Sequence, residues 1–390
     1  MMRHSLLFVA LLSLAGCGTV GKVSDTVGGW FGSNAPKPVE LSDFKASASL
    51  SKAWETQVGE ANRGDFAPDS DGQGVYAASS EGAVMRIDLV SGKTVWRINA
   101  GTRLTAGVGT GQGLVVAGTA KGDLLTWKAA DGSKAWSVNL GAEITARPVV
   151  SGGFVYARTG DGRVFKVDAQ DGKIQWAYSR VLPVLTLRSP AGVAVDSEVV
   201  YAGHPCGRLT ALAQNNGAPV WEANVALPKG STEIERIADV VGAPVVDGTL
   251  ACAGAFQGRV ACFDRGNGNL RWARDFSALR GIAIDGRALY AVDADAVVQA
   301  FDRNRGVSPW KQEGLKRRGI SMPLAVSEWV MVGDYAGMVH LLKRDDGAFA
   351  ARASTDGSAI IGQPLALSGT LSGGFVVQTA KGGLYAFKIQ

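Results

Sequence analysis

The amino-acid sequence predicts an all-β fold, an eight-bladed β-propeller with four antiparallel strands in each blade. Three observations support this prediction. A glycine stands fourteen residues before a tryptophan in repeated copies, successive tryptophans lie 38 to 51 residues apart, and the last copy is cut short at the end of the chain. A period of about forty residues made of short strands is typical of one propeller blade.

Each copy of the repeat has the same internal order, shown by residues 154–177. Strands are predicted at 154–157 and 164–167, with a glycine turn between them, and an outer strand at 174–177 follows the turn at Asp171 and Gly172. Thin blades must bury both faces against their neighbours, so a large flat side chain is expected in each gap. The tryptophans assigned to this structural role are Trp54, Trp96, Trp136, Trp176, Trp221, Trp272 and Trp310.

Two further features of the repeat lead to structural expectations. A second glycine precedes the tryptophan position by four residues in every copy, including the copy in which Ala351 replaces the tryptophan. Most copies carry an aspartate eight residues before the tryptophan, which we expect to accept hydrogen bonds from turn amides. These aspartates are Asp88, Asp168, Asp264 and Asp302.

The two ends of the chain complement each other. The eighth copy starts at Gly382 and stops at Gln390, before its tryptophan, while Trp54 stands ahead of the first full copy. The outer strand of the last blade is therefore predicted to come from residues 51–58. Pairing of the N-terminal strand with the C-terminal blade closes the ring and removes the open edges of the sheet.

The start of the chain predicts export and lipidation. Residues 1–16 have the Arg3 charge and the short apolar run of a signal peptide. The tetrapeptide ending at Cys17 resembles a bacterial lipobox, which implies lipidation of Cys17; an ordinary secretory signal is the alternative. Gly18 implies sorting to the outer membrane by the same resemblance. Residues 17–45 are predicted to be a flexible tether and residues 46–390 the propeller.

Composition argues against several classes of function. The net charge of +5 is scattered along the chain, so nucleic-acid binding is not expected. The three histidines have no nucleophile placed beside them by a motif, and no cysteine–histidine cluster occurs, so we expect no catalytic residue, no metal and no cofactor. Cys252 and Cys262 face each other across a predicted hairpin and form either a disulfide or two buried thiols, whereas Cys206 has no predicted partner.

The repeat resembles the tryptophan-docking repeat of quinoprotein propellers. Those dehydrogenases are longer and carry an adjacent cysteine pair, which this chain lacks. The combination of lipobox, short tether and bare eight-bladed ring is similar to the BamB family, propeller lipoproteins of the outer-membrane β-barrel assembly machinery. The resemblance implies a non-catalytic scaffold on the periplasmic face of the outer membrane. It also implies docking on the POTRA domains of BamA, with nascent outer-membrane proteins as a further partner.

Two segments that lengthen the repeat resemble the docking segments of that family. In residues 182–189 the resemblance implies that Leu185, Leu187 and Arg188 contact the partner, and in residues 230–240 it implies the same for Asp239. The family has a second acid where this chain has Val241. The alternatives are that the two leucines fold back onto a blade edge, and that Asp239 and Glu235 position arginines instead of touching the partner.

A second class of function stays open on the sequence alone. The quinoprotein resemblance is compatible with a periplasmic enzyme or ligand-binding propeller that uses the central channel. Cofactor-dependent absorbance and dye-linked oxidation would distinguish this alternative from the scaffold.

Overall fold

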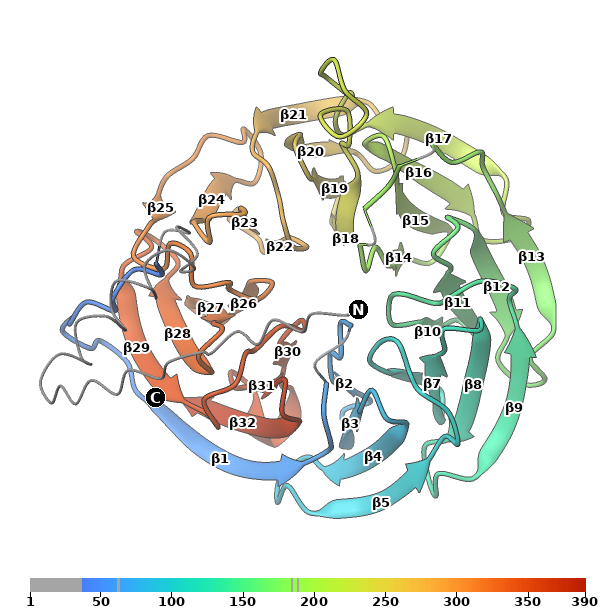
Figure 1. Cartoon of the computed structure of the whole chain (residues 1–390), viewed down its shortest axis with the longest axis horizontal. Helices are drawn as coiled ribbons and strands as arrows, with labels where there is room; N and C mark the ends of the chain where they lie inside the picture. The colour runs from blue at the N-terminus through green and yellow to red at the C-terminus, as the bar shows by residue number, and fades with distance from the viewer. Residues whose placement is uncertain (1–36, 62–63, 184, 188) are drawn as a thin grey trace, which may run out of the picture. The chain divides into compact units, whose positions relative to one another are not determined.

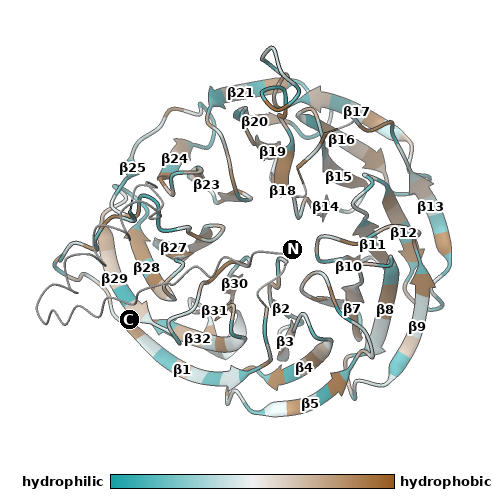
Figure 2. Cartoon of the chain, viewed as in Figure 1, coloured by the Kyte–Doolittle hydropathy of each residue, from teal (hydrophilic) through white to brown (hydrophobic). Residues whose placement is uncertain are grey.

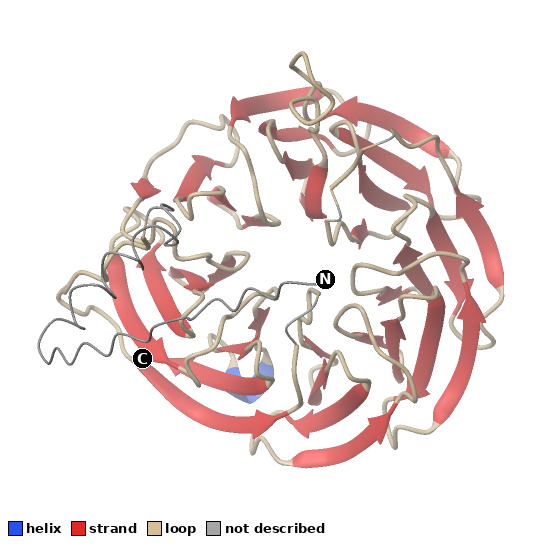
Figure 3. Cartoon of the chain, in the orientation of Figure 1, coloured by secondary structure: helices blue, strands red, loops and turns tan. Residues whose placement is uncertain are grey.

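The computed structural model describes residues 37–61, 64–183, 185–187 and 189–390. The strands of these residues form eight antiparallel four-stranded sheets arranged as a ring (Figure 1), which confirms the predicted eight-bladed propeller. The helical structure in the described part is limited to one 3-10 turn, η1 (Gly369–Leu371) (Figure 3). No helix among the described residues has the length and apolar character needed to cross a membrane.

The first four blades follow the chain without interruption. Blade one has β2 (Asp69–Ser70), β3 (Gly74–Ala78), β4 (Ala83–Asp88) and β5 (Thr94–Asn99); blade two has β6 (Gly109–Gly111), β7 (Leu114–Gly118), β8 (Asp123–Lys128) and β9 (Lys134–Asn139); blade three has β10 (Val149–Ser151), β11 (Phe154–Arg158), β12 (Val164–Asp168) and β13 (Ile174–Tyr178); blade four has β14 (Val193–Val195), β15 (Val199–His204), β16 (Arg208–Ala213) and β17 (Pro219–Asn224).

The second four blades include the one that joins the chain ends. Blade five has β18 (Val240–Asp247), β19 (Leu250–Ala255), β20 (Arg259–Asp264) and β21 (Leu270–Asp275); blade six has β22 (Ala283–Ile284), β23 (Ala288–Val292), β24 (Val298–Asp302) and β25 (Lys311–Gln312); blade seven has β26 (Leu324–Val326), β27 (Trp329–Gly333), β28 (Met338–Lys343) and β29 (Phe349–Ser354); blade eight has β30 (Leu365–Ala366), β31 (Phe375–Gln378), β32 (Gly383–Ile389) and β1 (Leu50–Gln57).

The middle strands of a blade are more deeply buried than its outer strand. In blade one all of β3 is buried, because both faces of this strand lie against neighbouring blades. The outer strand β5 alternates between exposed and partly buried residues, as expected for a strand with one solvated face. Figure 2 shows the same alternation of hydrophobic and hydrophilic residues along the outer rim.

The tryptophans of the repeat share one contact across each blade boundary. Each indole Nε1–H donates a hydrogen bond of 2.8–2.9 Å to a carbonyl in the hairpin turn before the outer strand of the next blade. Each ring also lies on the second glycine of the repeat in that turn. The tryptophan–glycine pairs are Trp54 with Gly92, Trp96 with Gly132, Trp136 with Gly172, Trp176 with Gly217, Trp221 with Gly268, Trp272 with Gly306, and Trp310 with Gly347.

This geometry explains why Ala351 replaces a tryptophan in blade seven. A tryptophan at that position would need the hairpin turn between the third and outer strands of blade eight. No such turn is present, because the outer strand of blade eight is β1, which comes from the opposite end of the propeller sequence and is not joined to β32 by a hairpin. Instead, the amides of Ser47 and Ala48 donate to the Ala350 carbonyl oxygen at 3.0 and 3.2 Å, so the N-terminal segment covers this boundary.

Substitution of Gly172 by alanine is expected to destabilise the ring more than the same change at Gly101. Both glycines have a positive φ, 76° and 72°, so alanine costs about 1–2 kcal/mol of backbone strain at either site. A Cβ at Gly172 would also lie 2.7 Å from the Trp136 ring, whereas one at Gly101 meets open space. The added overpacking costs about 1–3 kcal/mol. Equal unfolding free energies of the two variants in denaturant titrations would contradict the docking role of the glycine.

The ring closes through β1 and β32, as the sequence predicts. The two strands pair antiparallel from Leu50 opposite Ile389 to Gln57 opposite Gly383. Trp54 is buried in a cluster with Val75 of blade one and Val376 of blade eight, so the N-terminal strand joins the first and last blades.

The structure also tests the predicted roles of the repeat aspartates and of Cys252 and Cys262. Asp88 accepts a hydrogen bond from the Ser91 amide at 2.8 Å, and the other three repeat aspartates accept turn amides from two or three residues later, which confirms their predicted role. Cys252 on β19 lies opposite Cys262 on β20, and the two buried residues form a disulfide. Of the two alternatives left by the sequence, the structure therefore has the bonded pair.

Residues 38–49, here called the N-terminal strap, are packed on blades six and seven. The Val39 amide donates to the Lys316 carbonyl at 3.1 Å, Leu41 packs against the core of blade six, and the Phe44 ring lies 5.6 Å from that of Phe349. The predicted tether reached residue 45, but its described end is held against the ring. The reason is local, since these residues replace a missing tryptophan contact and cover the outer strand of blade seven.

A buried charged network fixes the strap. Arg318 donates from Nε to Asp334 at 2.7 Å and from Nη1 to the Val39 carbonyl at 3.1 Å. Arg352 donates from Nε to Nδ1 of His340 at 3.2 Å, so the other ring nitrogen of His340 carries the proton that is shared with Asp334. Burial lowers the pKa of His340 despite the neighbouring Asp334, which keeps the imidazole neutral at neutral pH.

Candidate docking site

The two longest connections between blades lie next to each other. The first long loop (residues 179–192) joins β13 to β14, and the second long loop (residues 225–239) joins β17 to β18. They meet where the Leu187 amide donates a 2.7 Å hydrogen bond to Asp239 Oδ2. These loops contain the residues that the sequence assigns to partner binding.

Asp239, which the resemblance assigns to partner contact, is buried beneath the first long loop. It is 4% exposed and accepts hydrogen bonds from two backbone amides, Leu187 at 2.7 Å and Cys206 at 3.1 Å. Burial raises the pKa of its carboxyl, while these amides and Arg158 act in the opposite direction. Asp239 thus holds the backbone of the first long loop through these hydrogen bonds. Val241, two residues later, is buried in the core of blade five.

The first long loop is fixed at both ends. At its start, Arg180 pairs with Glu222 of β17 at 2.9 Å. At its end, Arg158 of β11, which is 6% exposed, donates to the Ala191 carbonyl at 3.2 Å. Burial lowers the pKa of Arg158 to about 10, which leaves it charged at neutral pH. Burial and the nearby arginines lower the pKa of His204 to about 3, so this histidine adds no positive charge beneath the loop.

The structure separates the two predicted leucines. Leu187 is half-buried and packs against the core of blade five, as the fold-back alternative expected. Leu185 remains 45% exposed between the fixed ends of the loop. Arg188, the third residue assigned to docking, lies outside the described residues. Glu235 accepts the Ser231 and Thr232 amides at 2.8 and 3.1 Å, so it caps its own turn in the second long loop.

Three exposed apolar side chains on the two loops were not predicted as site residues. Val181 is 95% exposed, Leu227 55% and Ile234 67%. None of them belongs to the repeat, and each lies in a loop longer than the period requires. Apolar residues in repeat-lengthening insertions are thus the signal that could have found them. Together with Leu185 they give the loops an apolar surface beside arginines, a composition common at protein interfaces.

Comparison with known families agrees on one group of proteins. A family model described as outer membrane protein assembly factor BamB matches residues 80–312. A Bordetella pertussis protein named outer membrane protein assembly factor BamB is 37% identical over 383 residues, which cover 98% of this chain and 96% of that protein. The crystal structure of BamB from Moraxella catarrhalis superposes with a TM-score of 0.78 at 29% identity, covering 87% of this chain and 99% of that one.

A likeness to an enzyme extends to the fold alone. Quinohemoprotein alcohol dehydrogenase from Comamonas testosteroni has a TM-score of 0.70 but only 15% identity, and the match covers 87% of this chain and 76% of that one. Propeller rings host many unrelated functions, so this likeness assigns no chemistry to the chain.

Proposed function

Because the chain belongs to the BamB family of outer membrane protein assembly factors, we propose that it is a non-catalytic scaffold of the β-barrel assembly complex that docks on the periplasmic POTRA domains of BamA. It contributes to the insertion of barrel proteins by holding these domains beside the ring. Lipidation of Cys17, after removal of residues 1–16, anchors it to the periplasmic face of the outer membrane through a tether that ends at the N-terminal strap. Nascent outer-membrane proteins are its second class of partner.

One observation supports the position of the docking surface. The two long loops display Leu185 and Ile234 to solvent, while buried contacts at Asp239 and Arg158 hold the first of these loops in place. Apolar side chains on a fixed backbone lose little conformational freedom on binding, which favours affinity. Ordering such a loop by buried polar contacts would be hard to explain if its exposed residues bound nothing.

A charged substitution at Leu185 is expected to abolish capture of the partner. The test uses the chain from residue 18, immobilised, and the purified POTRA domains of its cognate BamA. Leu185→Asp removes an apolar contact and buries a charge in the interface, which at a central position costs 2 kcal/mol or more, about thirtyfold in affinity. Leu270→Asp is the matched control, because Leu270 is also a leucine, 54% exposed, but lies on the outer strand of blade five.

The outcomes of this comparison are distinct. Loss of capture in Leu185→Asp, retained capture in Leu270→Asp and unchanged melting of both would support the proposed surface. Equal capture by both variants would move docking to another part of the ring. Failure of the unsubstituted chain to bind POTRA domains would overturn the proposed partner.

A further inference from the structure

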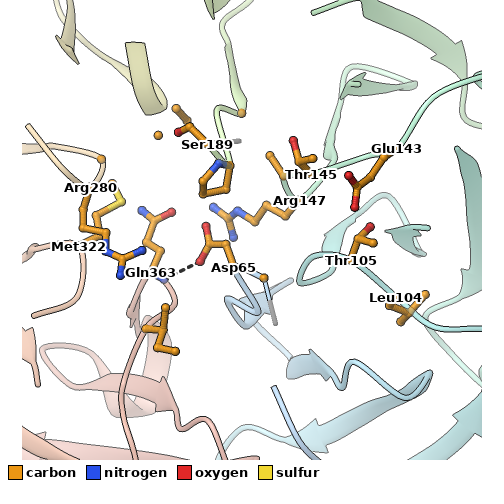
Figure 4. Close-up of a pocket in the computed structure, with 18 of the residues that line it drawn as sticks. Asp65, Leu104, Thr105, Glu143, Thr145, Arg147, Ser189, Arg280, Met322 and Gln363 are labelled. Carbon is orange, nitrogen blue, oxygen red and sulfur yellow. Dashed lines mark hydrogen bonds between the residues drawn. The ribbon is translucent and has the colours of Figure 1, made fainter. Parts of the chain in front are cut away.

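The ring encloses a cavity of about 700 Å³ that the docking surface does not use. Its wall is built by the segments that lead into the inner strands of the blades, including Asp65, Arg147, Arg280 and Gln363 (Figure 4). Ser189 and Pro190, at the end of the first long loop, line the same cavity. This volume is within the range of cavities that bind small molecules.

Asp65 and Arg280 line this cavity with opposite charges and do not form an ion pair with each other. Of the other charged side chains on the wall, Arg147 is engaged by Asp69 at 3.3 Å and Arg103 by Glu81 at 3.2 Å, and Glu143 lines the cavity as well. Asp65 accepts the Gln363 amide at 3.2 Å but forms no ion pair with Arg147 or Arg280 in the described part of the chain. Nε of Arg280 is buried and has no hydrogen-bond partner among the described residues. In Figure 4 the Asp65 carboxylate lies near Arg147, and the Gln363 side chain lies between Asp65 and Arg280.

The surroundings of Asp65 leave its carboxyl poorly satisfied. Burial raises its pKa, although Arg147, the Gln363 amide and Arg280 all act to lower it. The buried Nε of Arg280 lacks an acceptor among the described residues, and the Asp65 carboxylate has the Gln363 amide but no ion pair there, so both charges are incompletely compensated, which is costly. A ligand that offers a donor to one and an anionic acceptor to the other would offset both costs.

We propose that this cavity binds a carboxylate with an adjacent N–H donor, the chemistry shared by a free α-amino acid and by the C-terminal residue of a polypeptide. The ligand carboxylate pairs with Arg280, and its ammonium or amide N–H donates to Asp65. Arg147 is paired with Asp69 and Arg103 with Glu81, and the two opposite charges of Arg280 and Asp65 match a ligand with one anionic group and one donor. Leu279, Met322 and Ile361 line the same cavity and accommodate an apolar side chain.

Calorimetric titration of the chain from residue 18 with three leucine derivatives tests this proposal. Leucine carries both groups, N-acetyl-leucine mimics a peptide C-terminus, and leucinamide lacks the carboxylate. We expect a carboxylate-bearing ligand to bind, and leucinamide to bind at least about tenfold more weakly, because a charge-assisted hydrogen bond is lost. Tighter binding of leucine identifies a free amino acid as the ligand, and tighter binding of N-acetyl-leucine identifies a polypeptide end.

Substitutions locate the binding. Arg280→Met is expected to weaken binding about tenfold or more, while Arg287→Met, a 61% exposed side chain paired with Asp345, leaves binding unchanged. Melting curves that coincide for the two variants show that the ring is intact. Absence of binding by all three compounds, equal binding of leucinamide, or full binding by Arg280→Met would each overturn the proposal, and the first would mean that the cavity holds solvent only. Leu185→Asp is expected to bind these compounds normally. Failure of this proposal can therefore be distinguished from failure of the proposed docking on POTRA domains.

Discussion

A chain that begins at residue 60 is expected to lose the single cooperative unfolding transition of the intact ring. This truncation removes β1, and with it the pairing to β32 from Leu50 to Gln57. It also removes Trp54, whose ring lies on Gly92 and whose Nε1–H bonds the Leu89 carbonyl at 2.9 Å. Loss of a buried tryptophan alone costs about 3–5 kcal/mol, and the exposed edge of β32 adds a site for aggregation.

The truncation experiment has two internal controls. A chain that begins at residue 38 keeps both the N-terminal strap and β1 and should melt in one sharp transition. A peptide spanning residues 46–59, added to the shorter chain, should restore part of the cooperativity by supplying the missing strand in trans. If the chain from residue 60 melts as sharply as the chain from residue 38, closure by β1 is not what stabilises the ring.

Substitution of Asp239 by alanine is expected to abolish docking without removing any side chain that touches the partner. The change leaves the amides of Leu187 and Cys206 without acceptors in a buried setting, at about 1–3 kcal/mol for each unsatisfied group. The first long loop should then lose its fixed position, so that Leu185 no longer meets the partner in a defined place. Binding should fall even though the apolar surface is chemically unchanged.

Hydrogen exchange separates this positioning role from a general loss of stability. In Asp239→Ala, the amides of Leu187 and Cys206 should exchange faster than those of β11 or β19. Glu233→Ala is the matched control in the second long loop, because Glu233 is exposed and the change removes a long ion pair, 3.8 Å, with Arg236. That control should change stability by no more than about 0.5 kcal/mol. Unchanged exchange at Leu187 with retained capture would contradict the positioning role.

The periodic part of the molecule could be predicted from the sequence, because each blade boundary is packed by the same contact between a tryptophan and a glycine turn. The tryptophan spacing indicates the number of blades, and the cut eighth copy together with Trp54 indicates how the ring closes. The strap escaped prediction for the opposite reason. Residues 38–49 occur once, so no second copy reveals that they replace the contact missing at Ala351.

The site was less predictable, because the sequence does not say which way a loop folds. Leu185 and Leu187 look equivalent in an alternating segment, yet only Leu187 packs onto blade five. Asp239 looks like a surface acid, but its carboxyl is buried by the neighbouring loop. The cavity residues Asp65 and Arg280 are more than two hundred positions apart, and only ring closure brings them to one axis.

The N-terminal strap determines how the ring would carry a mechanical load. A force applied to the chain at residue 38 meets the bonds of Val39 to Lys316 and Arg318, and then the contact of Phe44 with Phe349, before it reaches β1. The strap therefore bears a pulling force on the tether before that force reaches the closing strand. Tension is passed to blades six and seven, while the strand that closes the ring stays unloaded.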